Sequence, residues 1–180
     1  MLDGHPVQFG PVAVVGNIGW YDYSFRDRRL RLRMSRYEQK RLPGVATFND
    51  VRFVQWRYSD EEFTRMCCKQ LREDIRAVNN QSSEIIAVTH FLPFQELVPD
   101  TQNPRYRFAR AFVGARCLGT VLKRFKSVRY VFCGHIHVQK EVRLESMRAF
   151  SLAGGRDANT LYELSLPSGE VNAHLFDSPG

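Results

Sequence analysis

The 180-residue chain lacks the features that mark membrane and secreted proteins. No apolar window approaches the roughly 18 residues that a membrane-spanning helix requires. The N-terminal residues 1–6 show no basic stretch followed by an apolar run, so nothing there resembles a signal peptide. We therefore expect no membrane partner.

Cysteine is sparse, and its spacing excludes a metal-binding or redox pair. The chain has four cysteines, Cys67, Cys68, Cys117 and Cys133, and none forms a C-x-x-C pair. The adjacent Cys67 and Cys68 cannot easily hold one metal ion with tetrahedral geometry. We interpret all four as reduced, partly buried thiols of a cytoplasmic protein.

Repeats, low-complexity tracts and interdomain linkers are also absent from the sequence. Hydrophobic residues make up 43% and charged residues 25%, which is the balance of an ordinary globular protein. A chain of this length can bury a core without disulfides. The sequence therefore predicts one α/β domain over residues 1–180.

The charge is less ordinary, because 26 Lys and Arg face 19 Asp and Glu, for a formal net charge of +7. Much of the excess lies in residues 26–41, where eight basic residues stand against two acidic ones: Arg26, Arg28, Arg29, Arg31, Arg33, Arg36, Lys40 and Arg41 against Asp27 and Glu38. Such a cluster attracts anions, including phosphorylated substrates or nucleic acid. The alternative is a solvated face without a partner, since stacking aromatics are sparse there.

The order of elements reads as alternating strands and helices, followed by strands alone. Residues 12–15 form a short apolar strand, and residues 51–56 are a weaker strand candidate. Ser59 and Glu62 predict a capping box at the start of a helix. One apolar face with a helical period continues from there: Phe63, Cys67, Leu71, Ile75 and Val78.

The second half of the chain repeats this alternation. Residues 85–90 and 128–133 are continuous apolar runs, typical of parallel strands covered on both faces. Between them we predict a proline-rich loop over 91–104 and a second amphipathic helix over 108–125. Four short β runs follow, at 139–144, 148–152, 160–166 and 170–176, with a hairpin turn at 167–169.

Two histidines come directly after the buried strands. His90 ends the 85–90 run, and Gly134 leads from the 128–133 run into His135 and His137. If the strands are parallel neighbours, these three imidazoles meet at one sheet edge, with Gly134 permitting a tight bend. Imidazole nitrogens bind zinc, iron, manganese and similar ions.

The structural alternative is that each histidine is only a hydrogen-bonded polar residue. That interpretation suits His174, which lies in a terminal β run without a partner. It suits Gly134-His135-Ile136-His137 less well, because a second strand-terminal histidine, His90, stands upstream. We therefore predict metal ligation by His90, His135 and His137.

These motifs resemble those of the calcineurin-like metallophosphoesterases. In that family D-x-H, G-D, G-N-H-D/E, a lone His after a strand and G-H-x-H occur in this order. Here Thr89-His90 resembles the lone His, and residues 134–137 match G-H-x-H. The resemblance implies an α/β fold with two β-sheets flanked by helices, of which this chain carries the C-terminal part.

The resemblance also implies a two-metal centre with Mn, Fe or Zn. His90 and His135 would bind one ion and His137 the other. An aspartate from G-D would bridge them, and G-N-H would supply an asparagine and a histidine that assists the leaving group. A hydroxide on the metals would attack a phosphate mono- or diester substrate.

The first three motifs of the family are not found in this chain. Asp3-Gly4-His5 spells D-x-H without a preceding strand, and Gly16-Asn17 spells G-N without the histidine, so we interpret both as coincidental. We expect a domain whose N-terminal portion is missing, with no catalytic residue identified and little activity in isolation. The alternative is a non-catalytic relict that binds one metal ion, and a polyanion through residues 26–41.

Overall fold

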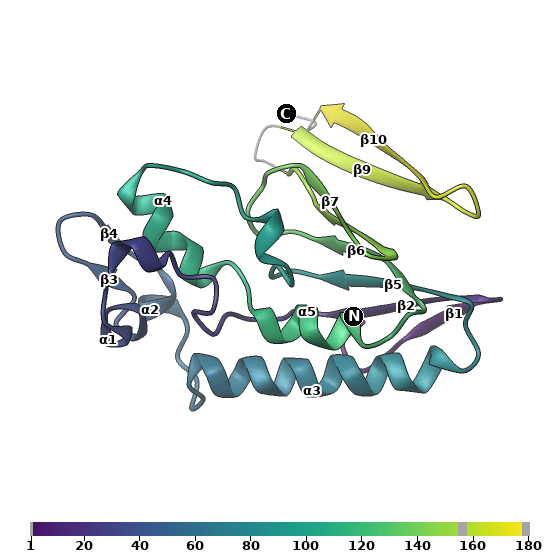
Figure 1. Ribbon diagram of the computed structural model, residues 1–180, viewed down its shortest axis with the longest axis horizontal. Helices are drawn as coiled ribbons and strands as arrows, with labels where there is room; N and C mark the ends of the chain where they lie inside the picture. Colours follow the sequence, from purple (N-terminus) through teal and green to yellow (C-terminus); the bar gives the residue numbers. More distant parts are fainter. Residues whose placement is uncertain (1, 155–157, 178–180) are drawn as a thin grey trace.

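A computed structural model describes residues 2–154 and 158–177 of the chain (Figure 1). Its centre is a six-stranded sheet in the order β1-β2-β5-β6-β8-β7. The strands are β1 Val7–Phe9, β2 Val12–Asn17, β5 Glu84–Thr89, β6 Val128–Cys133, β8 Met147–Ser151 and β7 Lys140–Leu144. The four inner strands are parallel, and the two edge strands pair with them antiparallel. The result is a mixed α/β fold.

Two helices, α3 (Asp60–Asn79) and α5 (Arg116–Lys123), lie along one face of this sheet (Figure 1). The predicted capping box is confirmed, because the Glu62 amide donates to Ser59 Oγ and the Ser59 amide donates to the Glu62 carboxylate. Leu71 and Ile75 of α3 are fully buried against the sheet, so the predicted apolar face is the face that packs.

A two-stranded hairpin lies over the opposite face. It consists of β9 (Ala158–Ser165) and β10 (Glu170–Asp177), joined through the predicted turn at residues 167–169. Leu164 and Val171 of the hairpin pack with Tyr130, Phe132 and Phe150 of the sheet. Of the four C-terminal strands, β9 and β10 form a separate sheet, whereas β7 and β8 extend the six-stranded one.

The prediction that the 85–90 strand is covered on both faces is wrong. Burial alternates along β5, and Val88 retains 36% of its exposure in the middle of the sheet. Ile85 and Ala87 point to the helices and are fully buried. An apolar run therefore did not imply two covered faces in this strand.

The carboxyl ends of the parallel strands face a separate group of short elements (Figure 1). They are η1 Arg28–Leu30, α1 Met34–Glu38, β3 Arg41–Leu42, β4 Ala46–Thr47, α2 Asp50–Phe53, η2 Gln95–Leu97, α4 Pro104–Ala109 and η3 Arg110–Phe112. Their centre is an aromatic cluster that includes Tyr21, Tyr23, Tyr37, Phe108 and Phe112.

Asp60 ties this aromatic cluster to the start of α3. Its buried carboxylate accepts from Trp20 Nε1 at 2.8 Å and from the Tyr23 hydroxyl, and it pairs with Lys40 Nζ at 2.7 Å. A buried carboxylate needs such partners, since an unpaired one costs several kcal/mol. Lys40 of the basic segment therefore has a structural role.

Two predicted elements are wrong. Residues 51–53 of the predicted 51–56 strand belong instead to the short helix α2, in which the Phe53 and Val54 amides bond to the carbonyls four residues back, and residues 54–56 are neither helix nor strand. Val51 and Phe53 are 49% and 78% exposed, so neither side chain supplies the burial that would favour a strand. The alternation that suggested a strand has no partner strand among the described residues.

The helix predicted over 108–125 is broken between η3 and α5. Leu92 crosses the chain there, donating its amide to the Val113 carbonyl and accepting from the Ala115 amide. A Cβ on Gly114 would lie 1.9 Å from the Leu92 carbonyl oxygen, so only glycine permits this crossing. The helical spacing of apolar residues continues in the sequence past Gly114, although the backbone leaves the helix there.

The four cysteines are free thiols, as predicted. Burial raises the pKa of Cys67 and of Cys133 to about 12, so both stay protonated near neutral pH. Among the described helices, none is long and apolar enough to cross a bilayer.

Replacing Ile75 by Ala should lower the free energy of unfolding by about 2–5 kcal/mol, because the side chain is fully buried and leaves a cavity. Met66→Ala on the same helix is the control, since Met66 is 46% exposed and should change stability by less than about 0.5 kcal/mol. Urea unfolding measures both. Equal losses in the two variants would contradict this assignment of the packed face.

Candidate metal centre

The candidate site lies where β5 and β6 end side by side. The two strands are parallel neighbours, which meets the condition for the histidines to approach one another, and Thr89 lies opposite Cys133 in the register. His90 and Gly134 follow these residues directly, and the Gly134 amide hydrogen bonds to the carbonyls of Thr89 and His90 at 3.3 and 3.2 Å. Pairing therefore continues past both strand ends and fixes the two histidine-bearing turns together.

This pairing brings His90 and His135 into contact. Nε2 of His90 lies 3.2 Å from Nδ1 of His135, and the two ring planes are 85° apart. Two imidazoles on one tetrahedral zinc have nitrogens about 3.3 Å apart, because each Zn–N bond is roughly 2.0–2.1 Å long. The observed separation therefore fits a shared metal ion.

Both imidazoles are held in the neutral state that ligation requires. Burial, followed by the neighbouring His90, lowers the pKa of His135 from 6.5 to about 4. Burial and the nearby His137 lower the pKa of His90 as well. The Phe91 ring packs on His135 at 4.3 Å between centroids, so an apolar surface supports this imidazole.

His137 does not join this pair. Its Nδ1 faces the Gly154 carbonyl oxygen, and its side chain is exposed. A carbonyl can only accept, so Nδ1 carries the proton and Nε2 keeps a lone pair for another ligand. Histidine ligands of metals commonly have such a second hydrogen bond to a backbone carbonyl.

The bend between the two histidines is made differently from the prediction. Gly134 does not have a positive φ; His135 and His137 do, at 70° and 52°. Ile136 between them packs against the main core. A Cβ on Gly134 would lie 3.4 Å from Nδ1 of His90, which is close to an ordinary van der Waals contact, so neither φ nor steric space requires glycine at this position.

Two polar residues outside the predicted ligand set, Asp3 and Asn17, line the same edge. Asn17 ends β2 opposite Thr89, and its side chain accepts from the Gly19 amide at 2.8 Å. Asp3 accepts from the Ile18 amide at 3.0 Å. Both border a hollow of about 530 Å³ that also includes His90 and Gly134. Asp3 follows no strand in the sequence. Its position depends on the long-range hydrogen bond from Ile18, which no sequence pattern predicts.

Few potential metal ligands among the described residues gather at this site. Within residues 2–154 and 158–177, no group of three or more His, Cys, Asp or Glu side chains is arranged to hold a metal ion. His174 lies on the hairpin, with Nε2 3.0 Å from Glu163 Oε2, which agrees with its assignment as structural. The arrangement thus offers one imidazole pair, with His137 beside it.

Comparison with known proteins places the fold. Neither the family models nor the curated protein sequences that we compared with the chain give a match. Among solved structures, the chain is similar to the phosphopantetheinyl hydrolase PptH from Mycobacterium tuberculosis, with a TM-score of 0.61 and 16% identity. The match covers 80% of this chain and 50% of PptH, so the chain spans half the length of that protein.

A second match is weaker. The sulfate thiohydrolase SoxB from Thermus thermophilus matches with a TM-score of 0.43 and 13% identity, over 96% of this chain and 24% of SoxB. That TM-score is too low to establish a shared fold. The match to PptH shows a shared fold, whereas function depends on the residues of the site.

The depressed pKa of His135 predicts a pH-dependent stability. The unfolded chain binds a proton at His135 below about pH 6.5, and the folded chain does so only near pH 4, so stability is complete above pH 6.5 and is lost towards pH 4. His135→Asn should flatten this slope between about pH 6.5 and 5, where carboxylates titrate little. Thermal melts in metal-free buffer across this range measure it.

His174→Asn is the matched control for that experiment, because His174 lies on the hairpin away from the pair. It should leave the slope as in the wild-type chain. If both variants give the same slope as the wild type, His135 does not titrate as its burial implies.

Proposed function

We propose that this chain is the histidine-bearing part of a metal-dependent phosphoesterase. In this proposal His90 and His135 hold one divalent ion, and His137 holds a second. The observation that carries it is the imidazole pair, whose nitrogens lie 3.2 Å apart at the ends of two adjacent parallel strands. In open α/β sheets, this edge is where ligands and reacting groups are bound.

The fold shared with PptH supports the hydrolase part of the proposal. PptH is named as a hydrolase, and its likeness extends over 80% of this chain. The phosphoester part rests on the resemblance of Thr89-His90 and of residues 134–137 to the metallophosphoesterase motifs.

The chain's own residues supply orientation and charge state. Burial keeps His135 neutral, and Phe91 packs on its ring. The Gly154 carbonyl fixes the tautomer of His137. When bound, divalent ions supply a water of lowered pKa and positive charge for the phosphoryl oxygens.

Among the described residues, no carboxylate joins His90 and His135 in a group of three metal ligands. Two cations at close range repel each other unless an anionic ligand lies between them. In the part of the chain that the structure describes, Asp3 is the carboxylate bordering the hollow that His90 lines. We therefore propose that turnover requires further residues, and that the chain alone hydrolyses phosphoesters weakly or not at all.

A second candidate is a relict domain that binds a single metal ion and a polyanion through residues 26–41. The observation that favours it is that just two imidazoles converge, with no three-ligand group among the described residues. The two candidates differ in metal content and in activity, so both quantities should be measured on the same preparation.

Metal content tests the assignment of the ligands. After a complete protein containing this chain is incubated with Zn²⁺ or Mn²⁺ and desalted, we expect about two ions per chain for the phosphoesterase and about one for the relict domain. His135→Ala should lose at least one ion, whereas His174→Ala should keep the wild-type content. Mass-spectrometric elemental analysis measures both variants. Equal metal content in wild type and His135→Ala would remove His135 from the site.

Activity tests the reaction. A complete protein containing this chain should hydrolyse p-nitrophenyl phosphate or its diester with Mn²⁺, and His90→Ala should lower kcat/KM by about 10²-fold or more, because the pair holds one ion. The matched control is His5→Ala, an exposed histidine near the N-terminus. A metal-loaded protein that leaves both esters intact would favour the relict domain.

A further inference from the structure

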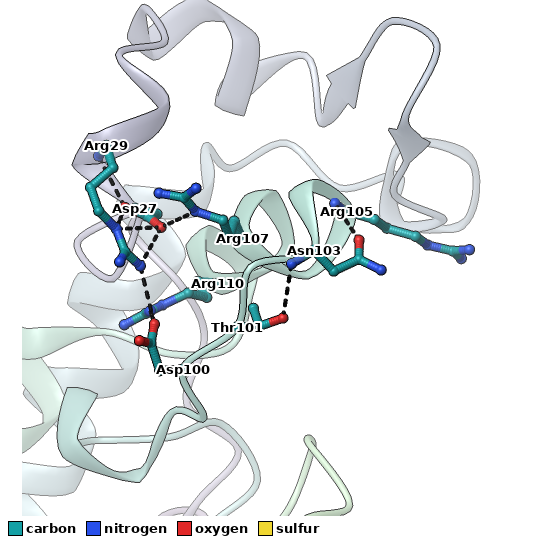
Figure 2. A network of polar contacts seen from close by, with 8 residues as sticks. All are labelled: Asp27, Arg29, Asp100, Thr101, Asn103, Arg105, Arg107 and Arg110. Carbon is teal, nitrogen blue, oxygen red and sulfur yellow. Dashed lines mark hydrogen bonds and ion pairs between the residues drawn. The ribbon is translucent and has the colours of Figure 1, made fainter.

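A cavity lined by arginines lies next to the hollow that contains His135. Its volume is about 350 Å³, and its basic residues are Arg26, Arg28, Arg29, Arg110 and Arg116. They come from the segment after β2, from η3 and from the first residue of α5. Figure 2 shows part of this group, with Arg29 and Arg110 directed at the same carboxylate, that of Asp100.

The two aspartates of the cavity do not balance this charge. Asp27 is buried and accepts from both Arg29 and Arg107, with the Arg107 Nε at 2.7 Å. These guanidinium groups hold the pKa of Asp27 well below its usual range. Asp100 accepts from Arg29 at 3.1 Å and from Arg110 at 3.2 Å. Both carboxylates are therefore already shared between arginines.

The remaining arginines are held by neutral acceptors or by none. Arg116 bonds to the Ser24 carbonyl and to the Gln95 side chain, and Arg26 bonds to the Tyr23 carbonyl at 3.2 Å. Arg28 makes no side-chain hydrogen bond to any residue that the structure describes. No carboxylate within residues 2–154 and 158–177 is in ion-pair distance of these three side chains.

Such a cluster is costly without an anion, since like charges around a cavity repel each other. Arg110 also has an unsatisfied donor, because its Nε is buried without a hydrogen-bond partner in the described part of the chain. Guanidinium groups bind phosphate oxygens through paired N–H donors. The cavity is also within the size range of small-molecule sites, which begins at roughly 300 Å³.

We propose that the arginine cavity is a binding site for a phosphate or diphosphate group of a small molecule. A concave site of this size suits one compact anion, whereas nucleic acid needs an extended basic groove with stacking aromatics. A neighbouring hollow of about 500 Å³ shares Arg110 and Arg116 with the cavity and is walled by Phe25 and Phe94, so an organic body attached to the anion has a place to lie.

The site is independent of the metal proposal. Arg110 and Asp100 also border the hollow that contains His135, so the two sites are adjacent but share no proposed ligand. Binding can therefore be measured with EDTA present, and His135→Ala should bind the anion as the wild type does. A failure of metal binding would leave this result unchanged.

Calorimetric titration of the 180-residue chain with inorganic pyrophosphate, in EDTA and low salt, tests the site. We expect one binding event that weakens as salt is added. Arg28→Gln and Arg116→Gln should each weaken binding by about tenfold or more, through loss of a charge-assisted contact. Arg28 makes no side-chain hydrogen bond within the described residues, so its variant should fold normally, and circular dichroism checks both.

Arg129→Gln is the matched control, because Arg129 is exposed at the amino end of β6, away from the cavity. It should bind pyrophosphate like the wild type. No measurable heat with the wild type would overturn the proposal, as would an equal loss in Arg129→Gln, which would indicate attraction by net charge alone. A nucleoside diphosphate titrated in parallel separates the sources: equal affinity identifies the free anion as ligand, and tighter binding identifies a larger phosphorylated molecule.

Discussion

The parallel pairing of β5 with β6 is the constraint on which the candidate site depends. It places Thr89 opposite Cys133, and the hydrogen bonds of the Gly134 amide extend the pairing by one more residue. A slip of one residue would turn every side chain of one strand to the other face of the sheet. His90 and His135 would then separate, so burial of Ile85 and Ala87 under the helices also sets the histidine geometry.

Contacts of Ile136 hold the left-handed conformation of the flanking residues His135 and His137. Positive φ at a non-glycine residue costs about 1–3 kcal/mol and persists only where the surroundings hold it. Here the Ile136 side chain packs in the core and its amide bonds to the Gly134 carbonyl at 2.9 Å. The core thus holds the middle residue, and the two flanking histidines project to the sheet edge. Strain of this kind is concentrated at functional sites, which agrees with a ligand-binding role.

Elements with a local cause could be predicted from the sequence, and those with a distant cause could not. The capping box at Ser59 and the apolar runs of β5 and β6 are local, and the structure confirms the cap and both strands, although β5 is covered on one face only. The break at Gly114 depends on Leu92, more than twenty residues away, and the insertion of β8 between β6 and β7 depends on sheet pairing. Asp3 reaches the site edge in the same way, through the Ile18 amide. The strand ends in the sequence therefore predicted the positions of His90 and His135, whereas long-range contacts determine which residues surround them.

The distribution of basic charge likewise has a local part, visible in the sequence, and a part that depends on contacts between distant residues. The sequence shows a basic segment over residues 26–41, which by itself suggests a diffuse attraction for polyanions. In the fold, Lys40 forms an ion pair with Asp60, and Arg29 forms ion pairs with Asp27 and Asp100. The remaining positive charge is concentrated at one cavity. Arg110 and Arg116, some eighty residues further along the chain, line it together with Arg26 and Arg28. Folding thus converts a stretch of excess charge into a concave group of guanidinium donors, and concave, pre-positioned donors select compact phosphate groups over extended polyanions.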